Sequence, residues 1–145
     1  MEISTFIFNI KISSKMTTLS AIPIRTPFID EILAGTKTWE IRSKFTKKIG
    51  PVALIRSKSG TVVGTANLSK VVEITASLGR ANARKMGMSP SEGADCEGLY
   101  AWVLEDVVKF KTPVPYKHPS GAVTWVTLDV PTTKKVLEET KRSNR

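Results

Sequence analysis

The sequence predicts an α+β domain, a curled sheet or small barrel of about five or six short strands with two or three helices between them. Two observations lead to this fold class. Short segments rich in Val, Ile and Thr recur between Gly and Pro turn signals, and segments with helical spacing of apolar residues separate them. A chain of 145 residues, of which 41% are hydrophobic, is also long enough for one domain with a buried core.

The first part of the domain is predicted to fold as strand, helix and strand. Residues 21–25 alternate in polarity as a short strand does. Thr26 and Pro27 then suit the N-cap and the first position of a helix, and Gly35 suits its C-terminal stop. The next strand covers residues 38–42. The helix between them carries four apolar residues at helical spacing: Phe28, Ile29, Ile32 and Leu33.

The rest of the domain is predicted to contain a hairpin, further helices and the longest strand. A break at Gly50-Pro51 precedes the hairpin, whose turn lies at Ser59-Gly60. The expected elements are, in order, strands over residues 52–57 and 61–74, a helix over 76–88, a loop or second short helix over 89–98 begun by Ser89-Pro90, a strand over 99–110 buried on both faces, an extended passage through Pro113 and Pro115, a strand over 122–128, and a charged helix or tail from Pro131.

These elements divide the chain into three parts. We expect residues 1–17 to be an N-terminal extension, residues 18–130 to be the domain, and residues 131–145 to be a charged C-terminal helix or tail. Met16 suggests that the first fifteen residues are an upstream extension, arising either from a choice of start site or from an added expression sequence. No signal peptide is predicted, because no basic region precedes the apolar beginning of the chain.

An excess of positive charge favours a polyanionic partner such as RNA. The chain has 22 Lys and Arg against 13 Asp and Glu, a formal net charge of +9 and a pI of about 9.9. As individual side chains, Lys44, Lys47 and Lys48 are expected to be solvated residues of a loop. They belong to a stretch over residues 37–58 in which seven cations accompany the single acid Glu40: Lys37, Arg42, Lys44, Lys47, Lys48, Arg56 and Lys58.

The single cysteine and the single histidine restrict the chemistry of the chain. Cys96 cannot form an internal disulfide, and together with His118 it cannot supply the ligands of a zinc site. Acidic neighbours are expected to raise the pKa of the Cys96 thiol, which disfavours a role as nucleophile. No apolar run reaches the roughly 18 to 20 residues of a membrane span. We therefore expect no metal, no cofactor, no membrane contact and a cytoplasmic location.

The strongest functional signal is the octapeptide Gly-Thr-Lys-Thr-Trp-Glu-Ile-Arg at residues 35–42. In an extended chain successive side chains point to opposite faces. Glu40 and Arg42 would therefore lie on one face, while Trp39 and Ile41 lie on the other. The apolar pair is expected to pack in the core, which leaves the charged face for a ligand.

Several segments of the chain together resemble the ASCH domain, a β-barrel family related to PUA domains. Their order and spacing match over about residues 19–128, and the resemblance implies a PUA-like small β-barrel with flanking helices. The matching segments are Ile22-Pro23-Ile24-Arg25 before Pro27-Phe28, the octapeptide, Gly50-Pro51 before an apolar strand, Val63-Gly64-Thr65-Ala66, Tyr100-Ala-Trp102-Val-Leu104-Glu105, and Pro113-Val-Pro115-Tyr116.

The resemblance implies a cleft between the barrel and the first helix, lined by Lys37, Glu40 and Arg42, with Arg25 nearby. ASCH domains are associated with RNA-linked processes; one branch hydrolyses N4-acylated cytidine nucleosides, and ribonuclease activity is described for another. The amidohydrolase branch uses a Lys, a Thr three residues later as nucleophile, and a downstream Glu. Here Glu40 stands at the position of that Thr, and a carboxylate cannot replace a hydroxyl in that acyl transfer.

The residues of this cleft have a binding interpretation and a structural one. Arg42 suits a bidentate contact with a phosphate or a base, and Glu40 suits hydrogen bonds from the amine edge of a nucleobase. Alternatively, these two residues form an ion pair that only stabilises the barrel. Tyr116 and His118 follow two prolines in an irregular segment, which makes them candidates for base stacking or proton transfer, although a lone loop histidine is usually solvated.

Three functions follow from these observations. The preferred one is binding of RNA, or of a modified nucleobase, nucleoside or nucleotide, through Arg25, Lys37, Glu40, Arg42, Tyr116 and His118. The second is a hydrolase, either a ribonuclease or an N4-acylcytidine amidohydrolase-like enzyme, in which Lys37 and Glu40 are the catalytic residues. The third is an adaptor whose residues 134–145 contact a partner protein.

Overall fold

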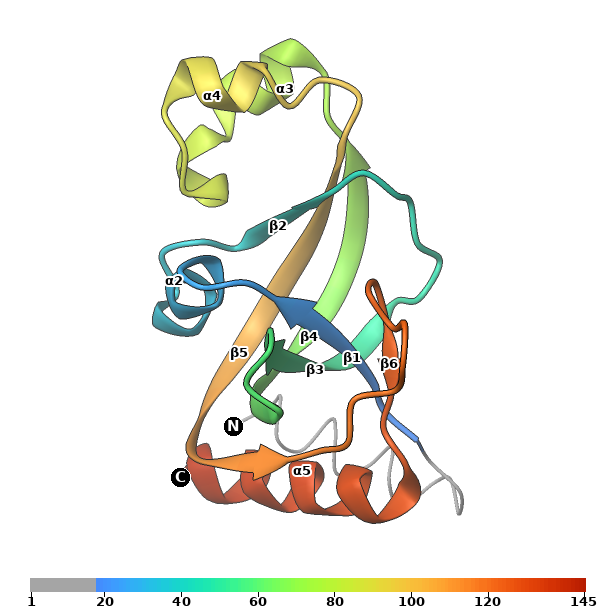
Figure 1. The fold of residues 1–145 in the computed structure, drawn as a ribbon. Helices are drawn as coiled ribbons and strands as arrows, with labels where there is room; N and C mark the ends of the chain where they lie inside the picture. The colour runs from blue at the N-terminus through green and yellow to red at the C-terminus, as the bar shows by residue number, and fades with distance from the viewer. Residues whose placement is uncertain (1–17) are drawn as a thin grey trace.

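A single curled sheet of six strands forms the framework of the protein. The computed structural model describes residues 18–145, in which the strand order is β2-β5-β4-β3-β1-β6 (Figure 1). The strands are β1 (Ser20–Ile24), β2 (Trp39–Arg42), β3 (Gly50–Arg56), β4 (Thr61–Glu73), β5 (Tyr100–Pro115) and β6 (Val126–Thr127). The helices are α2 (Phe28–Ala34), α3 (Ala76–Ala81), the short 3₁₀ helix η1 (Ala83–Met86), α4 (Pro90–Ala94) and α5 (Val130–Ser143). The predicted α+β class is confirmed, and the expected small barrel is an open half-barrel with β2 and β6 at its edges.

The curl of the sheet arises along the two longest strands. Strands β4 and β5 pair antiparallel, and their register shifts at three places. Such irregularities bend a strand and increase its twist. At Gly64 of β4 a side chain would collide with the backbone carbonyl of Val108 and with the side chain of Leu33 in α2. A glycine at this point therefore lets α2 and β5 approach β4 closely.

Helix α2 ends as predicted but begins differently. Gly35 closes the helix with a left-handed φ of 86°, as its predicted role as a stop requires. The prediction of Thr26 as N-cap is wrong: the cap position is Pro27, and no side chain caps the helix. The hydroxyl of Thr26 instead accepts a hydrogen bond from Arg56 at 3.3 Å. The Thr26–Pro27 peptide bond is cis.

A small helical lobe follows β4. The prediction of one helix over residues 76–88 is wrong: the segment forms two short helices, α3 and η1, separated by a turn at Asn82. Of the two structures expected for residues 89–98, the short helix forms, and Ser89 and Glu92 make a capping box at its start. This lobe lies at one end of the molecule, and α5 lies at the opposite end (Figure 1).

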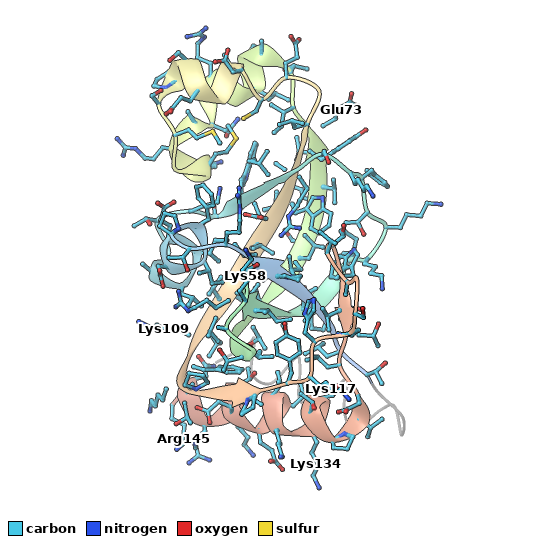
Figure 2. All side chains as sticks on the ribbon, viewed as in Figure 1. Lys58, Glu73, Lys109, Lys117, Lys134 and Arg145 are labelled. Atoms are coloured by element: carbon cyan, nitrogen blue, oxygen red, sulfur yellow. The ribbon has the colours of Figure 1, made fainter. Side chains whose placement is uncertain are left out.

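The C-terminal third also departs from the predicted boundaries. Strand β5 continues through Pro113 and Pro115, because its pairing with β4 persists to Thr61. The strand predicted over residues 122–128 is much shorter, and only Val126–Thr127 pair with β1. From Val130 the chain forms α5, with Asp129 as its side-chain cap. Figure 2 shows Lys134 and Arg145 at this end of the molecule and Glu73 at the end with the helical lobe.

The core lies between the sheet and the helices that cover it. Its largest cluster joins β1, α2 and the central strands around the fully buried Trp102. A second cluster includes Val136 of α5, and a third joins Trp39 to the helical lobe. The predicted N-terminal extension, residues 1–17 with Met16, lies outside the described residues. None of the helices between residues 18 and 145 is long and apolar enough to cross a membrane.

Candidate functional site

One cleft brings together all the candidate site residues named from the sequence. It is a cavity of about 790 Å³ bordered by the β1–α2 connection, strand β2, the β3–β4 turn and the segment before β6. This volume is in the range of clefts that hold small ligands. The six candidate residues in its lining are Arg25, Lys37, Glu40, Arg42, Tyr116 and His118.

Strand β2 supplies the charged wall of the cleft. Its alternation directs Trp39 into the core next to Ile74 and Met86, while Glu40 and Arg42 line the cleft. Ile41 is half-buried between the two environments. Trp39 on one face and Glu40 and Arg42 on the other thus lie as the alternation predicts, whereas Ile41 borders the cleft as well as the core.

Arg42 and Glu40 form an ion pair inside the cleft. The Arg42 Nε donates to Glu40 Oε2 at 3.0 Å, and its Nη2 donates to the carbonyl oxygen of Pro23 at 2.7 Å. The guanidinium also lies 5.4 Å from the ring centre of Trp102. The predicted ion pair between Glu40 and Arg42 therefore exists, but it leaves some hydrogen-bonding groups of both side chains outside the pair. A guanidinium has five N–H donors, and Glu40 keeps Oε1 outside the pair.

Lys37 lies at the back of the cleft. The residue is only 3% exposed, and its Nζ donates to the carbonyl oxygen of Met86 at 2.9 Å. The same ammonium lies 5.5 Å from the centre of the Phe28 ring. Burial lowers the pKa of Lys37, while the nearby Glu40 and Glu31 carboxylates oppose this shift.

Tyr116 and His118 form a fixed pair on the other side of the cleft. The Tyr116 hydroxyl lies 2.8 Å from His118 Nδ1, and His118 Nε2 lies 2.8 Å from the carbonyl oxygen of Ala122. Because a carbonyl oxygen can only accept, the proton belongs on Nε2, and in the neutral imidazole Nδ1 accepts from the tyrosine. Both ring nitrogens are thus engaged. Burial also raises the pKa of Tyr116, which keeps its hydroxyl protonated.

The lining also includes two cationic residues at the rim, Arg25 and Lys58, and the apolar residues Phe28 and Met88. Arg25 and Lys58 are both exposed at the edge of the cleft. Sequence reasoning did not assign Lys58, Phe28 or Met88 to the site. Lys58 carries a positive φ of 66° in the β3–β4 turn, which no local pattern signals. The helical spacing of apolar residues assigned Phe28 to the buried face of its helix, but in α2 the buried residues are Ile29 and Ile32.

Other predictions about single residues can be compared with the structure. Lys44, Lys47 and Lys48 are exposed in the loop after β2, as expected for solvated side chains. Cys96 is buried, and its thiol pKa is raised, chiefly by burial and also by Asp95 and Glu92, whereas Lys37 opposes the shift. The sequence predicted the effect of the acidic neighbours on the pKa of the Cys96 thiol, but not the larger effect of its burial.

Comparisons with known proteins agree on one family. The model of the ASCH domain matches residues 22–114. The crystal structure of ASCH from Zymomonas mobilis has a TM-score of 0.64 at 20% identity, covering 82% of this chain and 93% of that chain. No curated protein matches the sequence.

Two variants of the Zymomonas mobilis protein give the same result. A tyrosine-to-phenylalanine variant has a TM-score of 0.64 at 18% identity and covers 84% of this chain and 98% of that chain. A serine-to-alanine variant has a TM-score of 0.63 at 20% identity and covers 82% of this chain and 94% of that chain. At these identities the likeness shows a shared fold.

Proposed function

The chain belongs to the ASCH domain family, and we propose that its cleft binds RNA or a modified nucleobase, nucleoside or nucleotide. One observation carries this proposal. Three segments far apart in the sequence, around Arg25, the octapeptide and residues 116–118, meet at one cavity in which four cations outnumber a single carboxylate. A concave site with this charge balance favours an anionic ligand of small-molecule size.

The inner wall offers the groups that recognise a nucleobase. Glu40 Oε1 can accept from an exocyclic amine, and the remaining N–H groups of Arg42 can donate to a ring nitrogen or carbonyl. The ion pair between them holds both side chains in place before a ligand arrives. Preorganisation of this kind reduces the entropy lost on binding.

The outer wall offers groups for a phosphate and a ring face. Arg25 and Lys58 at the rim suit a phosphate or a phosphodiester. Tyr116 presents an aromatic ring that its bond to His118 holds in place. We assign His118 the role of positioning Tyr116, because both of its ring nitrogens already have partners.

The proposal is tested by RNA binding at a series of salt concentrations. We expect Arg42→Ala to weaken binding of a labelled single-stranded RNA by about 1–3 kcal/mol, the value of a good bidentate contact. Arg56→Ala is the matched control. It also removes an arginine from an ion pair, here with Asp30 at 2.7 Å, but Arg56 does not line the cleft. Fluorescence anisotropy with both variants separates a site contact from the loss of one charge.

Two results would contradict this function. Binding that does not change with salt would exclude electrostatic capture, since each phosphate contact to a single strand contributes about 0.7 to the slope of log affinity against log salt. Equal losses in Arg42→Ala and Arg56→Ala would show that only net charge matters. Salt-independent binding would thus remove the electrostatic mechanism, and equal losses would show that the cleft is not the RNA site.

A hydrolase is the second candidate, and the buried Lys37 favours it. A lysine whose pKa is lowered by burial is better suited to exchange a proton near neutral pH than an ordinary lysine. The amidohydrolase pattern is still incomplete, because Thr38 lines a second hollow beside Trp39 and not the cleft. Incubation with RNA and with N4-acetylcytidine distinguishes the candidates: turnover that disappears in Lys37→Ala would establish an enzyme.

The protein partner of residues 134–145 and the cytoplasmic location are predictions from the sequence that need their own experiments. Contact between residues 134–145 and a protein partner is a proposal that needs a binding experiment with surface variants of α5. The cytoplasmic location depends on the single, unpaired cysteine and is checked by imaging a tagged chain.

A further inference from the structure

The loop between β2 and β3 exposes aromatic and apolar side chains among lysines. Residues 43–49, the basic loop, run Ser-Lys-Phe-Thr-Lys-Lys-Ile and contain no acid. Phe45 is 57% exposed and Ile49 is 55% exposed. Lys44, Lys47 and Lys48 are exposed around them. Figure 1 shows this segment, in teal, running from the end of β2 to the start of β3.

The basic loop is held in place by contacts with the sheet and by a hydrogen bond within the loop. The indole Nε1 of Trp102 donates to the carbonyl oxygen of Lys44 at 3.0 Å. The buried hydroxyl of Thr46 accepts from the backbone N–H of Lys48 at 3.1 Å. Phe45 packs at 71° to the ring of Tyr100, with their centres 5.9 Å apart. Phe45 is therefore exposed on a loop whose conformation is fixed by these contacts.

A row of aromatic rings and cations connects the basic loop to the cleft. Arg42 lines the cleft and contacts Trp102, whose ring stacks on Trp125 with centres 5.3 Å apart. On the loop side, Lys48 Nζ lies 5.2 Å from the centre of the Trp125 ring. The distance from the cleft to the loop is thus spanned by packed side chains that carry positive charge at both ends.

This arrangement fits the two requirements of single-strand binding. Sequence-tolerant binding of single strands combines cations that follow the phosphates with aromatic rings on which bases stack. The basic loop supplies three lysines and one exposed ring, and Ile49 adds apolar surface. Double-stranded RNA keeps its bases stacked inside the helix and offers no free base to Phe45.

We propose that the basic loop is a stacking platform for single-stranded RNA, and that the cleft therefore receives one nucleotide of a longer strand. Phe45 stacks on a base next to the nucleotide in the cleft, and Lys44 and Lys47 contact the phosphates of the same strand. This inference rests on the proposed function of the cleft and adds that the ligand is an oligonucleotide.

The test compares ligands and variants in the same binding assay. The full chain is titrated into a labelled single-stranded RNA of about 10 nucleotides, within the range one small domain occupies. A duplex of the same sequence and cytidine monophosphate serve as competitors. We expect the single strand to bind at least tenfold more tightly than either competitor. Phe45→Ala should weaken binding of the single strand about tenfold, and Phe45→Trp should restore it, since a stacked base contributes roughly that factor or more.

Charge is tested with a matched pair of double variants. Lys44→Gln/Lys47→Gln and Lys134→Gln/Lys135→Gln each lower the formal net charge of +9 by two. The second pair lies on α5, at the end of the molecule away from the helical lobe (Figure 2). Only the loop variant should reduce the salt slope, by about 1.4 for two contacts at about 0.7 each.

The outcomes separate this inference from the function of the cleft. If Arg42→Ala weakens binding but Phe45→Ala and Phe45→Trp do not differ from the wild type, the cleft stands and the platform is overturned. If Phe45→Ala weakens binding and Arg42→Ala does not, the platform stands and the cleft function fails. Self-association that Phe45→Ala abolishes, without a change in RNA affinity, would assign the loop to a contact between copies and would overturn the platform.

Discussion

At the scale of single residues, the burial of Lys37 in the lining of the cleft has an energetic cost. Its ammonium is buried at the back of the cleft, where one backbone carbonyl and two nearby carboxylates offset the loss of water. The groups that influence it from neighbouring elements are Glu31 of α2, Glu40 of β2 and Cys96 after α4. Burial is the largest effect, so the folded state holds this proton less tightly than the unfolded state does.

The sign of the resulting pH dependence follows directly. Between the lowered pKa of folded Lys37 and its ordinary value of 10.5, the unfolded chain binds more protons, and stability rises with pH. Below that window the full cost of burying the charge is present. The neutral variant Lys37→Met removes this term. We therefore expect the free energy of unfolding of the wild type, relative to Lys37→Met, to increase from pH 7 to pH 10.

Urea unfolding of both proteins at several pH values between 7 and 10 measures this difference. Lys85→Met is a suitable control, because Lys85 is an exposed lysine whose Nζ lies over the ring of Trp39. Its difference from the wild type should stay nearly constant over the same range. A constant difference for Lys37→Met as well would show that the buried ammonium keeps an ordinary pKa.

At the scale of elements, the helical lobe depends on a backbone contact between α3 and α4. The two helices cross at Gly79 and Gly93, where a side chain on either residue would overlap the carbonyl oxygen of the other. The lobe also supplies the Met86 carbonyl to Lys37, and the Lys85 carbonyl accepts from the backbone N–H of Thr38. Its position therefore affects the cleft.

Gly79→Ala should separate these helices. We expect a loss of about 1–3 kcal/mol in the free energy of unfolding, the usual cost of overpacking a close contact. RNA affinity should fall with it, because the carbonyl that holds Lys37 moves with the lobe. Ser91→Ala, on the exposed side of α4, changes a single side chain without crowding the contact and should leave both quantities within error. Thermal unfolding and anisotropy measure the two effects, and a fully stable Gly79→Ala variant would contradict the close contact.

The elements also show what the sequence could and could not predict. Local signals were sufficient at Gly35 and at the Ser59-Gly60 turn, because one residue type with a special backbone conformation decides the structure there. The break at Asn82 is marked by neither Gly nor Pro, and the helix before it packs closely on α4 at Gly79 and Gly93. Strand β5 runs through Pro113 and Pro115 because its partner strand continues, which is a tertiary effect.

The same distinction applies to the cleft. The octapeptide was found from its alternation, and Arg25, Tyr116 and His118 came from the family resemblance and from an irregular segment. Their meeting in one cavity depends on the parallel pairing of β1 with β3 and on the return of the chain before β6. No local pattern contains this information. Phe28 and Lys58 were missed because each satisfies an ordinary local role, one on a helix and one in a turn.

At the scale of the whole molecule, α5 is part of the core that supports the sheet. Val136 and Leu137 are almost fully buried, and Val136 packs in the same cluster as residues of β1, β3 and β5. The hydroxyl of Thr140 lies 3.1 Å from that of Thr65 in β4. Glu139 binds the β5 strand through the backbone N–H of Thr112 and is also held by Ser143.

A chain that ends after Asp129 should therefore lose most of its stability. Removing two buried aliphatic side chains costs about 1.5–3 kcal/mol each, and further burial is lost with them. Typical domains have about 5–15 kcal/mol in total, so we expect the truncated chain to melt at least 10 °C lower or to lack a cooperative transition. Thermal unfolding followed by circular dichroism measures this, with Lys134→Gln/Lys135→Gln as a control that should melt like the wild type. A truncated chain with an unchanged melting temperature would show that α5 is an appendage, and only then could its deletion report on a protein partner.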